Sequence, residues 1–531
     1  MLADLLNRLP FGTSSFEALR ETGEIYVDKT SYVYLLASNR GKYFLARPRR
    51  FGKSLLISTF ESLFKYGLRD FKDLEIAALW KESKQYLVVR LDFSRVKPGA
   101  SFEEFKAYFE DYIDMQFQKI GFKRNRVNFL SNQLESFISS LPTSSLVLLI
   151  DEYDAPLTAC LDRPELFKQV RNYLSQFYSV FKANDAAVRF LFITGITKFN
   201  KTSIFSELNN LSDISLSPEF GSILGYTRSE VENYFQKYLE ISSKVLKIDV
   251  QNLLRELTRH YDGFCFELTA SEKVFVPWSL LKFFAYPAAG FADYWFESGG
   301  RPTVLLNYLH SQSLRNPEEY GKEYSLSLNV LSGSSDPASL SDIGLLTQAG
   351  YLTIKRVEGE TAYVGYPNVE VKTAMAQLYT EELLAGKTLE QAGAGRIAQR
   401  LATESVESIV HMLNRLFSSL DYMNYPVRNE ASLRSFIQVF FSGVGLDPIV
   451  ERHNAHGRSD LEVRAGDRVW LLELKVAKAG ENSERLLQEA VTQIKERCYG
   501  YSHSDETLIR VALVFSAEKR EFIHWQSCPK A

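Results

Sequence analysis

Two segments near the C-terminus alternate apolar and polar residues, which is the pattern of paired strands. They span 459–463 and 469–475, and the turn residues Ala465-Gly466-Asp467-Arg468 lie between them. The pattern therefore predicts a hairpin. Because side chains two apart share one face of a strand, we expect Glu473 and Lys475 side by side, with Asp460 near Glu473 on the other arm.

Two carboxylates and a lysine on one face suit a divalent metal and a phosphodiester. Carboxylate oxygens bind Mg²⁺, the metal lowers the pKa of a bound water, and an ammonium offsets charge that develops on a phosphate. The alternative is a solvated strand face, which is the usual state of a Glu-x-Lys triplet. The hydrophobic neighbours on both faces of 469–475 argue against it, since a buried acid or lysine is rare unless it is paired or functional.

The N-terminal third carries a motif in the context that a phosphate-binding loop requires. The apolar segment 43–46 precedes Arg47-Pro48-Arg49-Arg50-Phe51-Gly52-Lys53-Ser54, and apolar residues then recur at helical spacing. We expect loop amides to hold phosphate oxygens, Lys53 to reach the β- and γ-phosphates and Ser54 to ligate Mg²⁺. Arg50 and Gly52 join the predicted nucleotide-binding residues because a basic loop suits a polyphosphate. Arg47 stands where the full motif has glycine, so the loop is degenerate, and a solvated basic turn is the alternative.

Two further apolar segments end in polar residues. Residues 146–150 lead into Asp151 and Glu152, in the positions of the acids that organise Mg²⁺ and polarise the attacking water in ATPases. A buried strand with a charged end is the alternative. Residues 189–193 lead into Thr194, where many ATPases place a side chain that senses the γ-phosphate. Strands that alternate with helices predict a parallel, doubly wound sheet, with its ligand at the carboxyl ends of the strands.

The middle of the chain predicts helices followed by a helix and a hairpin. An amphipathic helical stretch covers about 226–261, and 332–341 has the composition of a loop. Residues 343–350 are predicted to be helical and 351–366 to form a hairpin. A helix followed by a hairpin resembles a winged helix, a module that serves in DNA binding or in packing between domains.

Composition limits the classes of protein that remain. The 531 residues carry a formal net charge of −3, so the molecule is not a polycation, and any nucleic-acid contact must come from local patches. The four cysteines lie far apart without metal-ligand spacing, which is typical of reduced cytosolic thiols. No signal peptide or membrane-spanning run is apparent, so we expect a cytoplasmic protein with no membrane partner.

Five motifs stand out along the chain: Tyr26-Val27-Asp28-Lys29-Thr30, the 47–54 loop, Asp151-Glu152-Tyr153-Asp154-Ala155-Pro156, Thr194-Gly195-Ile196-Thr197-Lys198-Phe199 and Tyr261-Asp262-Gly263-Phe264. Together they resemble the AAA-ATPase-like family of bacterial proteins, and the C-terminal part of the chain is similar to the PD-(D/E)XK nuclease domain that usually follows it. The resemblance covers nearly the whole chain. It predicts an α/β protein with a P-loop parallel sheet at 1–222, a helical lid and winged-helix-like region at 223–385, and a nuclease-like domain at 386–531.

The nuclease resemblance implies a core of helix, three-stranded sheet, helix and strand. It also implies a helix acid, for which Glu430 is the first candidate and Glu451 a rival. Gln493 and Tyr499 fit the Gln-x5-Tyr pattern of many such domains. The implied site residues are therefore the metal ligands Asp460 and Glu473, the catalytic Lys475, and Glu430 and Gln493 beside them.

Together these parts predict an ATP-binding protein with a Mg²⁺-dependent nuclease, in which the ATPase gates or positions the nuclease. Defence or mobile-element biology is the expected setting, and nucleic acid, with DNA favoured, is the expected partner. The alternative is a nucleotide-dependent signalling or interaction switch with a non-catalytic nuclease-like domain; the intact Asp460, Glu473 and Lys475 favour the first. A small-molecule kinase is disfavoured by the Asp151-Glu152 pair. The sequence leaves open DNA against RNA and the oligomeric state.

Overall fold

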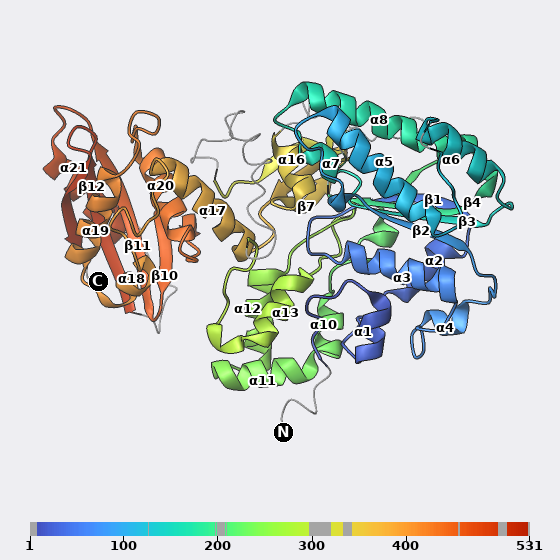
Figure 1. Cartoon of the computed structure of the whole chain (residues 1–531). Coiled ribbons are helices and arrows are strands. Elements are labelled where there is room, and N and C mark those ends of the chain that lie inside the picture. Colours follow the sequence, from blue (N-terminus) through green and yellow to red (C-terminus); the bar gives the residue numbers. More distant parts are fainter. Residues whose placement is uncertain are drawn as a thin grey trace. The chain divides into compact units, whose positions relative to one another are not determined.

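The computed structural model describes residues 8–125, 127–196, 198, 208, 210–296, 320–332, 342–454, 457–496 and 507–528. Contacts within the chain divide it into two compact units (Figure 1). The N-terminal unit comprises Met1–Leu314 and Glu323–Asn368, and the C-terminal unit comprises Arg315–Lys322 and Val369–Ala531. Every helix in the part of the chain that the structure describes is too short or too polar to cross a bilayer.

The N-terminal unit is built on a parallel five-stranded sheet in the order β2-β3-β4-β1-β5. Every residue of β3 and β4 is buried, as expected of central parallel strands with both faces covered. The predicted parallel sheet is thereby confirmed. Its strands are β1 (Gly41–Ala46), β2 (Leu87–Asp92), β3 (Leu146–Asp151), β4 (Val188–Gly195) and β5 (Ser212–Asp213).

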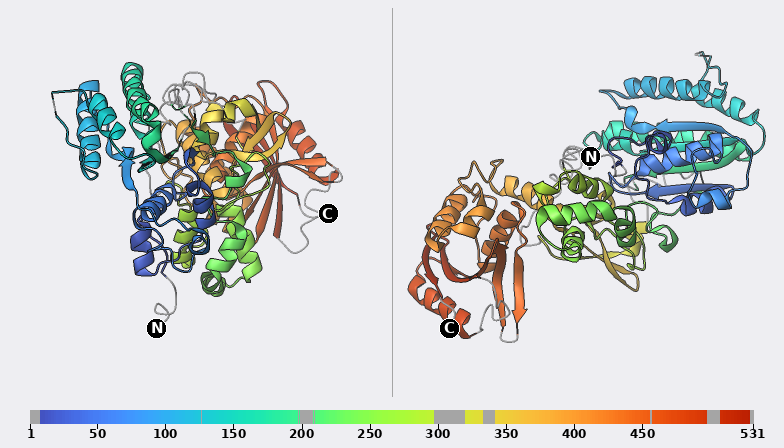
Figure 2. Two further views of the ribbon diagram at one scale, coloured as in Figure 1. Left: turned by 90° about the vertical axis from the view of Figure 1, so that its right-hand side faces the viewer. Right: turned by 90° about the horizontal axis from the view of Figure 1, so that it is seen from below.

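Helices cover both faces of this sheet (Figures 1 and 2). α3 packs on β2 and β3 from one side, while α5 packs on β2 and on α8 from the other. The helices of this part are α1 (Phe16–Thr22), α2 (Thr30–Ala37), α3 (Lys53–Tyr66), α4 (Ile76–Leu79), α5 (Phe102–Gln118), α6 (Leu130–Ser139), α7 (Ala155–Thr158) and α8 (Pro164–Ala183).

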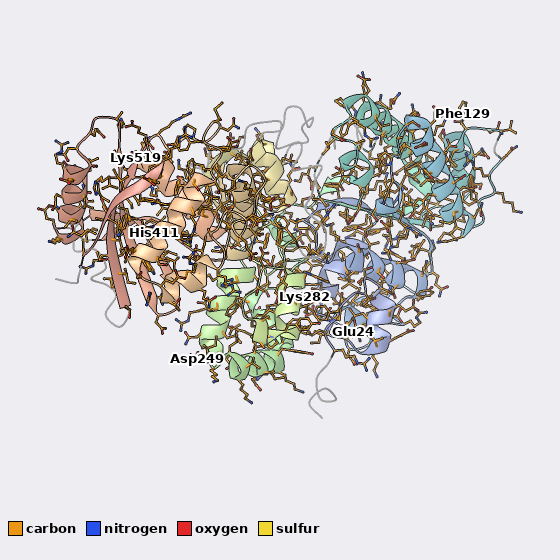
Figure 3. The ribbon with its side chains drawn as sticks, turned by 60° about the vertical axis from the view of Figure 1, so that its left-hand side comes forward. Glu24, Phe129, Asp249, Lys282, His411 and Lys519 are labelled. Carbon is orange, nitrogen blue, oxygen red and sulfur yellow. The ribbon has the colours of Figure 1, made fainter. Side chains whose placement is uncertain are left out.

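A helical region follows the sheet, as predicted. Local caps define where its helices begin: Thr227 and Glu230 form a capping box at α10, and the Asp249 side chain accepts a hydrogen bond from Asn252 N (2.8 Å) at α12. Asp249 is labelled in Figure 3. The helices are α10 (Arg228–Tyr234), α11 (Gln236–Leu246), α12 (Val250–Tyr261) and α13 (Pro277–Ala285).

The remainder of this unit is a helix with a small antiparallel sheet in the order β6-β8-β7. Of the loop predicted at 332–341, Ser332 is the last residue of the helix Leu328–Ser332, and 333–341 lie outside the described residues. The elements are β6 (Tyr324–Ser327), α15 (Leu328–Ser332), α16 (Asp342–Ala349), β7 (Thr353–Glu358) and β8 (Thr361–Gly365).

Gly350, between α16 and β7, lies against the 47–54 loop. Its φ is +87°, and a Cβ built there would lie 2.5 Å from Pro48 Cβ and Cγ. A side chain at this position would therefore meet both a strained backbone and the loop itself.

The C-terminal unit is built on a mixed sheet in the order β13-β12-β11-β10-β9, in which β11 and β12 are parallel and the other neighbours antiparallel. α20, β9 to β11, α21 and β12 follow one another along the chain, which confirms the predicted core order. Its elements are α17 (Val369–Leu383), α18 (Ile397–Thr403), α19 (Val406–Ser418), α20 (Glu430–Ser442), β9 (Ile449–Asn454), β10 (Gly457–Ala465), β11 (Arg468–Ala477), α21 (Ser483–Glu496), β12 (Thr507–Ser516) and β13 (Glu521–Ser527).

The two faces of β11 enter different cores because its side chains alternate. Leu471 packs with Ala490, Val491 and Ile494 of α21 on one face. On the other, the indole of Trp470 is buried and donates a hydrogen bond to Leu401 O of α18 (2.9 Å). β11 is therefore a covered central strand, and acids placed on it are shielded from water.

We predict that Gly350→Ala destabilises the N-terminal unit. The new methyl group has to displace Pro48 and also pays for its left-handed backbone, for a total of about 2–4 kcal/mol. Gly359→Ala is the matched control, because Gly359 has φ +60° with nothing within 4 Å of its Cβ position. Scanning calorimetry of the full chain measures both, and equal losses would show that the contact with Pro48 has no energetic weight.

Candidate functional site

Asp460 and Glu473 lie next to the point where the β10–β11 pairing ends. Leu461 pairs with Leu472, and continuing that register by one residue would bring Asp460 opposite Glu473. Asp460 Oδ2 accepts a hydrogen bond from Leu474 N (2.8 Å). The carboxylate oxygen thus accepts the hydrogen bond that a backbone carbonyl of the neighbouring strand would accept in a regular sheet. The Asp460 side chain is thereby held between the two strands.

Lys475 completes this group. Its Nζ lies 3.6 Å from Glu473 Oε1, so the two side chains share one face of β11. Glu473 is only 3% exposed. The structure therefore brings Asp460, Glu473 and Lys475 together at one end of the β10–β11 pair.

α20 supplies two more charged groups. Asn429 caps this helix, and Glu430 Oε1 accepts a hydrogen bond from Val476 N of β11 (3.4 Å). One helical turn later, Arg434 Nη1 lies 3.5 Å from Asp460 Oδ1. The sequence pattern did not single out Arg434; its only signal was the four-residue spacing from Glu430. The side chain of Glu451, the rival acid, lies outside the described residues.

The pKa of the Asp460 carboxyl is raised from its ordinary value, chiefly by burial. The hydrogen bond from Leu474 N and the charges of Arg434 and Lys475 oppose this rise, while Glu430 adds to it. Removal from water thus outweighs the nearby cations. The charged form of Asp460 therefore needs a cation or a strong hydrogen-bond donor nearby.

Gln493 lies on α21, which covers the face of β11 that bears Leu471 and Glu473. Its Oε1 is buried and accepts no hydrogen bond from the described residues. The described contacts do not join Gln493 to the acids, and Tyr499 lies outside the described residues.

The donor set fits a magnesium ion by its chemistry. Asp460 and Glu473 offer hard oxygen ligands. The backbone carbonyl of Leu474, which lies between Glu473 and Lys475, is a third oxygen of this type. Among the described residues, however, three or more His, Cys, Asp or Glu side chains do not gather as a metal site. A metal would have two carboxylates here, and it would compete with Arg434 for Asp460.

The predicted phosphate-binding loop joins β1 to α3 in the N-terminal unit. Arg50 and Gly52 have φ of 74° and 97°, and α3 begins at Lys53. The buried Lys53 Nζ donates hydrogen bonds to two carbonyls of its own loop, Arg47 O (2.9 Å) and Pro48 O (2.8 Å). Burial lowers the pKa of Lys53, with Glu152 and Asp151 opposing.

Two neighbouring strand ends carry the predicted acids and Thr194. Thr194 Oγ1 donates a hydrogen bond to Asp151 Oδ1 (2.6 Å), and both residues are buried. Glu152 follows with a left-handed φ of 51°. Burial raises its pKa, while the charge of Lys53 lowers it. Lys53, Asp151, Glu152 and Thr194 therefore gather at the carboxyl ends of β1, β3 and β4.

Two predicted nucleotide-binding residues are placed differently. The Arg50 guanidinium stacks 4.3 Å from the ring centroid of Trp278 on α13, so it contacts the helical region. Ser54 is half-buried in the first turn of α3, and its side chain makes no hydrogen bond with the described residues.

The motif at 26–30 has a structural part that the sequence did not reveal. Asp28 Oδ1 accepts a hydrogen bond from Thr30 N (2.8 Å) at the start of α2, and Asp28 Oδ2 accepts one from Glu75 N (2.8 Å). Lys29 Nζ lies 2.6 Å from Glu230 Oε1 of α10. This motif therefore ties the sheet's helices to the helical region.

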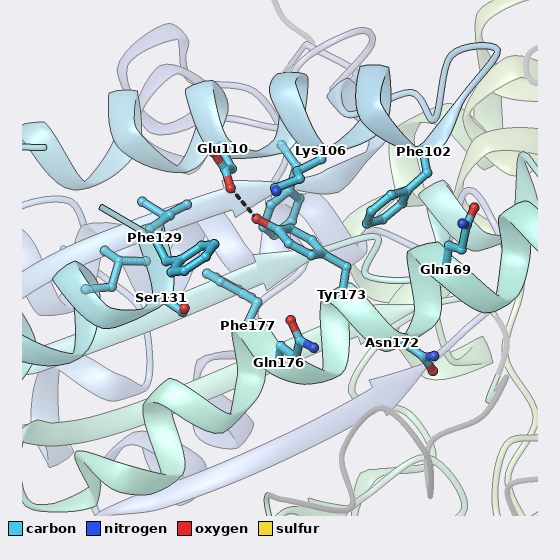
Figure 4. Close-up of a pocket in the computed structure, with 13 residues that line it drawn as sticks. Phe102, Lys106, Glu110, Phe129, Ser131, Gln169, Asn172, Tyr173, Gln176 and Phe177 are labelled. Atoms are coloured by element: carbon cyan, nitrogen blue, oxygen red, sulfur yellow. Dashed lines mark hydrogen bonds between the residues drawn. The ribbon is translucent and has the colours of Figure 1, made fainter. Parts of the chain in front are cut away.

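Two cavities are lined by none of the predicted site acids. One of about 70 Å³ adjoins Gly52 and is lined largely by apolar residues, among them Leu55, Leu224 and Pro277. The other, of about 370 Å³, lies between α5, α6 and α8 and is lined by aromatic rings and amides (Figure 4). Inside the second, Tyr173 donates a hydrogen bond to Glu110 Oε1 (2.6 Å). The residues described around it include none of the predicted site residues.

Comparison with known proteins agrees with the two motif sets. Residues 10–205 match a family model described as predicted AAA-ATPase, and residues 428–525 match that of the PD-(D/E)XK nuclease superfamily. A protein of Azotobacter chroococcum mcd 1, described as an uncharacterized protein in the vnfD 5′ region, is 29% identical over 531 residues, which cover 97% of this chain and 98% of the relative. The chain is therefore similar to the predicted AAA-ATPase family over residues 10–205 and to the PD-(D/E)XK nuclease superfamily over residues 428–525, which is the arrangement that its motifs predicted.

Proposed function

We propose that this protein is a Mg²⁺-dependent nuclease whose activity is gated or positioned by an ATP-binding module. The observation that carries the proposal is the group of Asp460, Glu473 and Lys475 at one end of the β10–β11 pair. A buried Glu473 and a half-buried Asp460 beside an ammonium are costly to maintain for structure alone. DNA is the proposed substrate, in defence or mobile-element biology, in the cytoplasm.

Each residue has a separate task in this proposal. Asp460 and Glu473 would hold Mg²⁺, which when bound would supply a water of lowered pKa. Lys475, 3.6 Å from Glu473 Oε1, would offset the charge that develops on the scissile phosphate. Glu430, bonded to Val476 N, would keep α20 and its charges against β11.

The nucleotide would bind where Lys53, Asp151, Glu152 and Thr194 gather. Lys53 would exchange its loop carbonyls for phosphate oxygens, which form stronger charge-assisted hydrogen bonds. The apolar cavity beside Gly52 would receive the base in this proposal, since it adjoins the start of α3. In this proposal the P-loop domain spans 1–222, the lid region 223–385 and the nuclease domain 386–531.

A second candidate is a nucleotide-dependent switch with a non-catalytic nuclease-like domain. The position of Arg434 favours it, because a guanidinium beside Asp460 already supplies the positive charge that a metal would bring. The deciding experiment is cleavage of plasmid DNA with Mg²⁺ or Mn²⁺, with and without ATP, by the wild type and Lys475→Ala. Cleavage that Lys475→Ala loses supports the nuclease, whereas no cleavage under any condition supports the switch.

We predict that Asp460→Ala and Glu473→Ala each reduce metal-dependent cleavage by about 10²-fold or more, since each removes an oxygen ligand and transition-state charge stabilisation. Circular dichroism should show an intact fold. Glu407→Ala, at an exposed acid of α19, is the control and should cleave normally. Normal cleavage by both site variants would exclude the nuclease assignment.

We predict that Lys53→Ala weakens ATP binding, whereas Glu152→Gln leaves binding intact and slows hydrolysis. Lys53 would meet the phosphates in the bound state, but Glu152 would act on the attacking water, so its loss is felt in the transition state. Calorimetry with ATP and Mg²⁺ measures the first effect and phosphate release the second. A wild type that binds no ATP at millimolar concentration would make this module a structural platform for the nuclease.

A further inference from the structure

The cavity between α5, α6 and α8 is large enough to hold a small molecule. Its volume of about 370 Å³ lies within the range of about 300–1,000 Å³ that is usual for ligand pockets. Lys106 and Glu110 of α5 line it, together with Phe129 at the start of α6 and Tyr173 of α8 (Figure 4). Neither the ATP site nor the nuclease site proposed above uses a residue of this wall.

Aromatic rings form part of the wall, and their contacts with one another hold them in place. The ring centroids of Phe102 and Tyr173 lie 5.8 Å apart, and those of Phe109 and Tyr173 lie 5.7 Å apart, both with edge-to-face geometry. The hydrogen bond from the Tyr173 hydroxyl to Glu110 Oε1 (2.6 Å) fixes the same ring from its other end. These rings therefore form an ordered aromatic surface in the absence of a ligand, which lowers the entropy cost of binding one.

Phe129 is the aromatic side chain of this wall that is most open to water. It lines the cavity and is nevertheless 72% exposed. A flat aromatic ligand would stack on this ring and remove it from water, which is how bases bind to exposed aromatic side chains.

Lys106 gives the cavity a positive charge. Its side chain points from α5 toward α8 (Figure 4). Glu110, one helical turn further along α5, accepts the hydrogen bond of Tyr173 and forms an ion pair with Arg124. Within the part of the chain that the structure describes, the Lys106 ammonium has no hydrogen bond and no ion pair. An anionic group on a ligand would therefore find a cation here.

Two amides on α8 supply neutral hydrogen-bonding groups. Gln169 and Gln176 lie seven residues apart, which places them on one face of the helix, and both line the cavity. Their side chains are exposed and make no hydrogen bond with the described residues. Each amide offers a donor and an acceptor, as does the edge of a nucleobase.

We propose that this cavity binds a free nucleoside monophosphate. The base would stack on Phe129, Gln169 and Gln176 would hydrogen-bond to the edge of the base, and the Lys106 ammonium would pair with the phosphate. An apolar ligand would take water from the amides and the ammonium without replacing its hydrogen bonds. A cationic ligand would be repelled by Lys106, and a neutral ring would leave this charge without an anion. The proposal does not rest on the ATP site or on the nuclease.

The test is calorimetric titration of the full chain with adenosine 5′-monophosphate (AMP), with a metal chelator present so that no nucleic acid is cleaved. Adenosine, inorganic phosphate and a single-stranded oligonucleotide with a 5′-phosphate are titrated in parallel. The wild type should bind AMP at least about tenfold more tightly than adenosine or phosphate alone, because only AMP carries both a base and an anionic group.

Lys106→Met should bind AMP about as weakly as the wild type binds adenosine. Phe129→Ala should bind both AMP and adenosine about tenfold more weakly, because it removes the stacking surface. Lys168→Met and Tyr108→Ala are the matched controls and should bind AMP normally. Lys168 is exposed on α8, Tyr108 is 65% exposed on α5, and neither lines the cavity. Should Lys106→Met fail to fold, Phe129→Ala and its control decide, since the Phe129 side chain is largely exposed.

Four results would overturn the proposal. The first is a wild type that binds no AMP at millimolar concentration, and the second is normal AMP binding by Lys106→Met and Phe129→Ala. The third is an equal loss of AMP binding in the two control variants. The fourth is binding of the oligonucleotide without binding of AMP, which would assign the cavity to the end of a strand.

Lys53→Met distinguishes this cavity from the phosphate-binding loop. It should bind AMP like the wild type, because Lys53 does not line the cavity. Loss of AMP binding in Lys53→Met together with normal binding in Phe129→Ala would place AMP in the loop and refute the proposal.

Discussion

Burial of charged groups on or next to covered strands is the constraint on which both units depend. β3 and β4 are buried along their whole length, so a polar group at their ends must find its partner within the protein. Asp151 accepts from Thr194, and Lys53 donates to its own loop. In the other unit, Asp460 meets Leu474 N and Arg434. Asp151, Lys53 and Asp460 therefore each have a partner within the protein.

A ligand at either site has to exchange partners and cannot simply add contacts. ATP would gain the Lys53 ammonium only as that group leaves Arg47 O and Pro48 O. The net affinity is then the difference between charge-assisted bonds to phosphate and the two carbonyl bonds that are lost. Gly350 lies close to this loop, since a Cβ built there would lie 2.5 Å from Pro48 Cβ and Cγ, so the α16–β7 connection packs against the residue whose carbonyl Lys53 contacts.

The sequence predicted the features that depend on local periodicity. The two-residue alternation at 469–475 and the turn before it predicted the β10–β11 hairpin, and strand, loop and helix around Lys53 predicted β1 and α3. Local periodicity could not predict in which direction a long side chain points. Arg50 lies on Trp278 and Arg47 turns toward Ser215, since each meets residues more than 150 positions away. The division of the chain at 222 and 385 and the roles of the site residues stay predictions.

The contact between Arg434 and Asp460 determines how the proposed nuclease would respond to metal. Asp460 is part of the strand pairing through Leu474 N, so its carboxylate is anchored by Oδ2, and Oδ1 is the oxygen that Arg434 approaches. A metal ion would compete with the guanidinium for that oxygen, and the exchange would cost little in local charge because one cation replaces another. The displaced Arg434 would remain on α20, one turn from Glu430, in a partly buried setting where an anion is its best partner. A phosphodiester is such an anion, so metal binding would itself prepare this unit for its substrate.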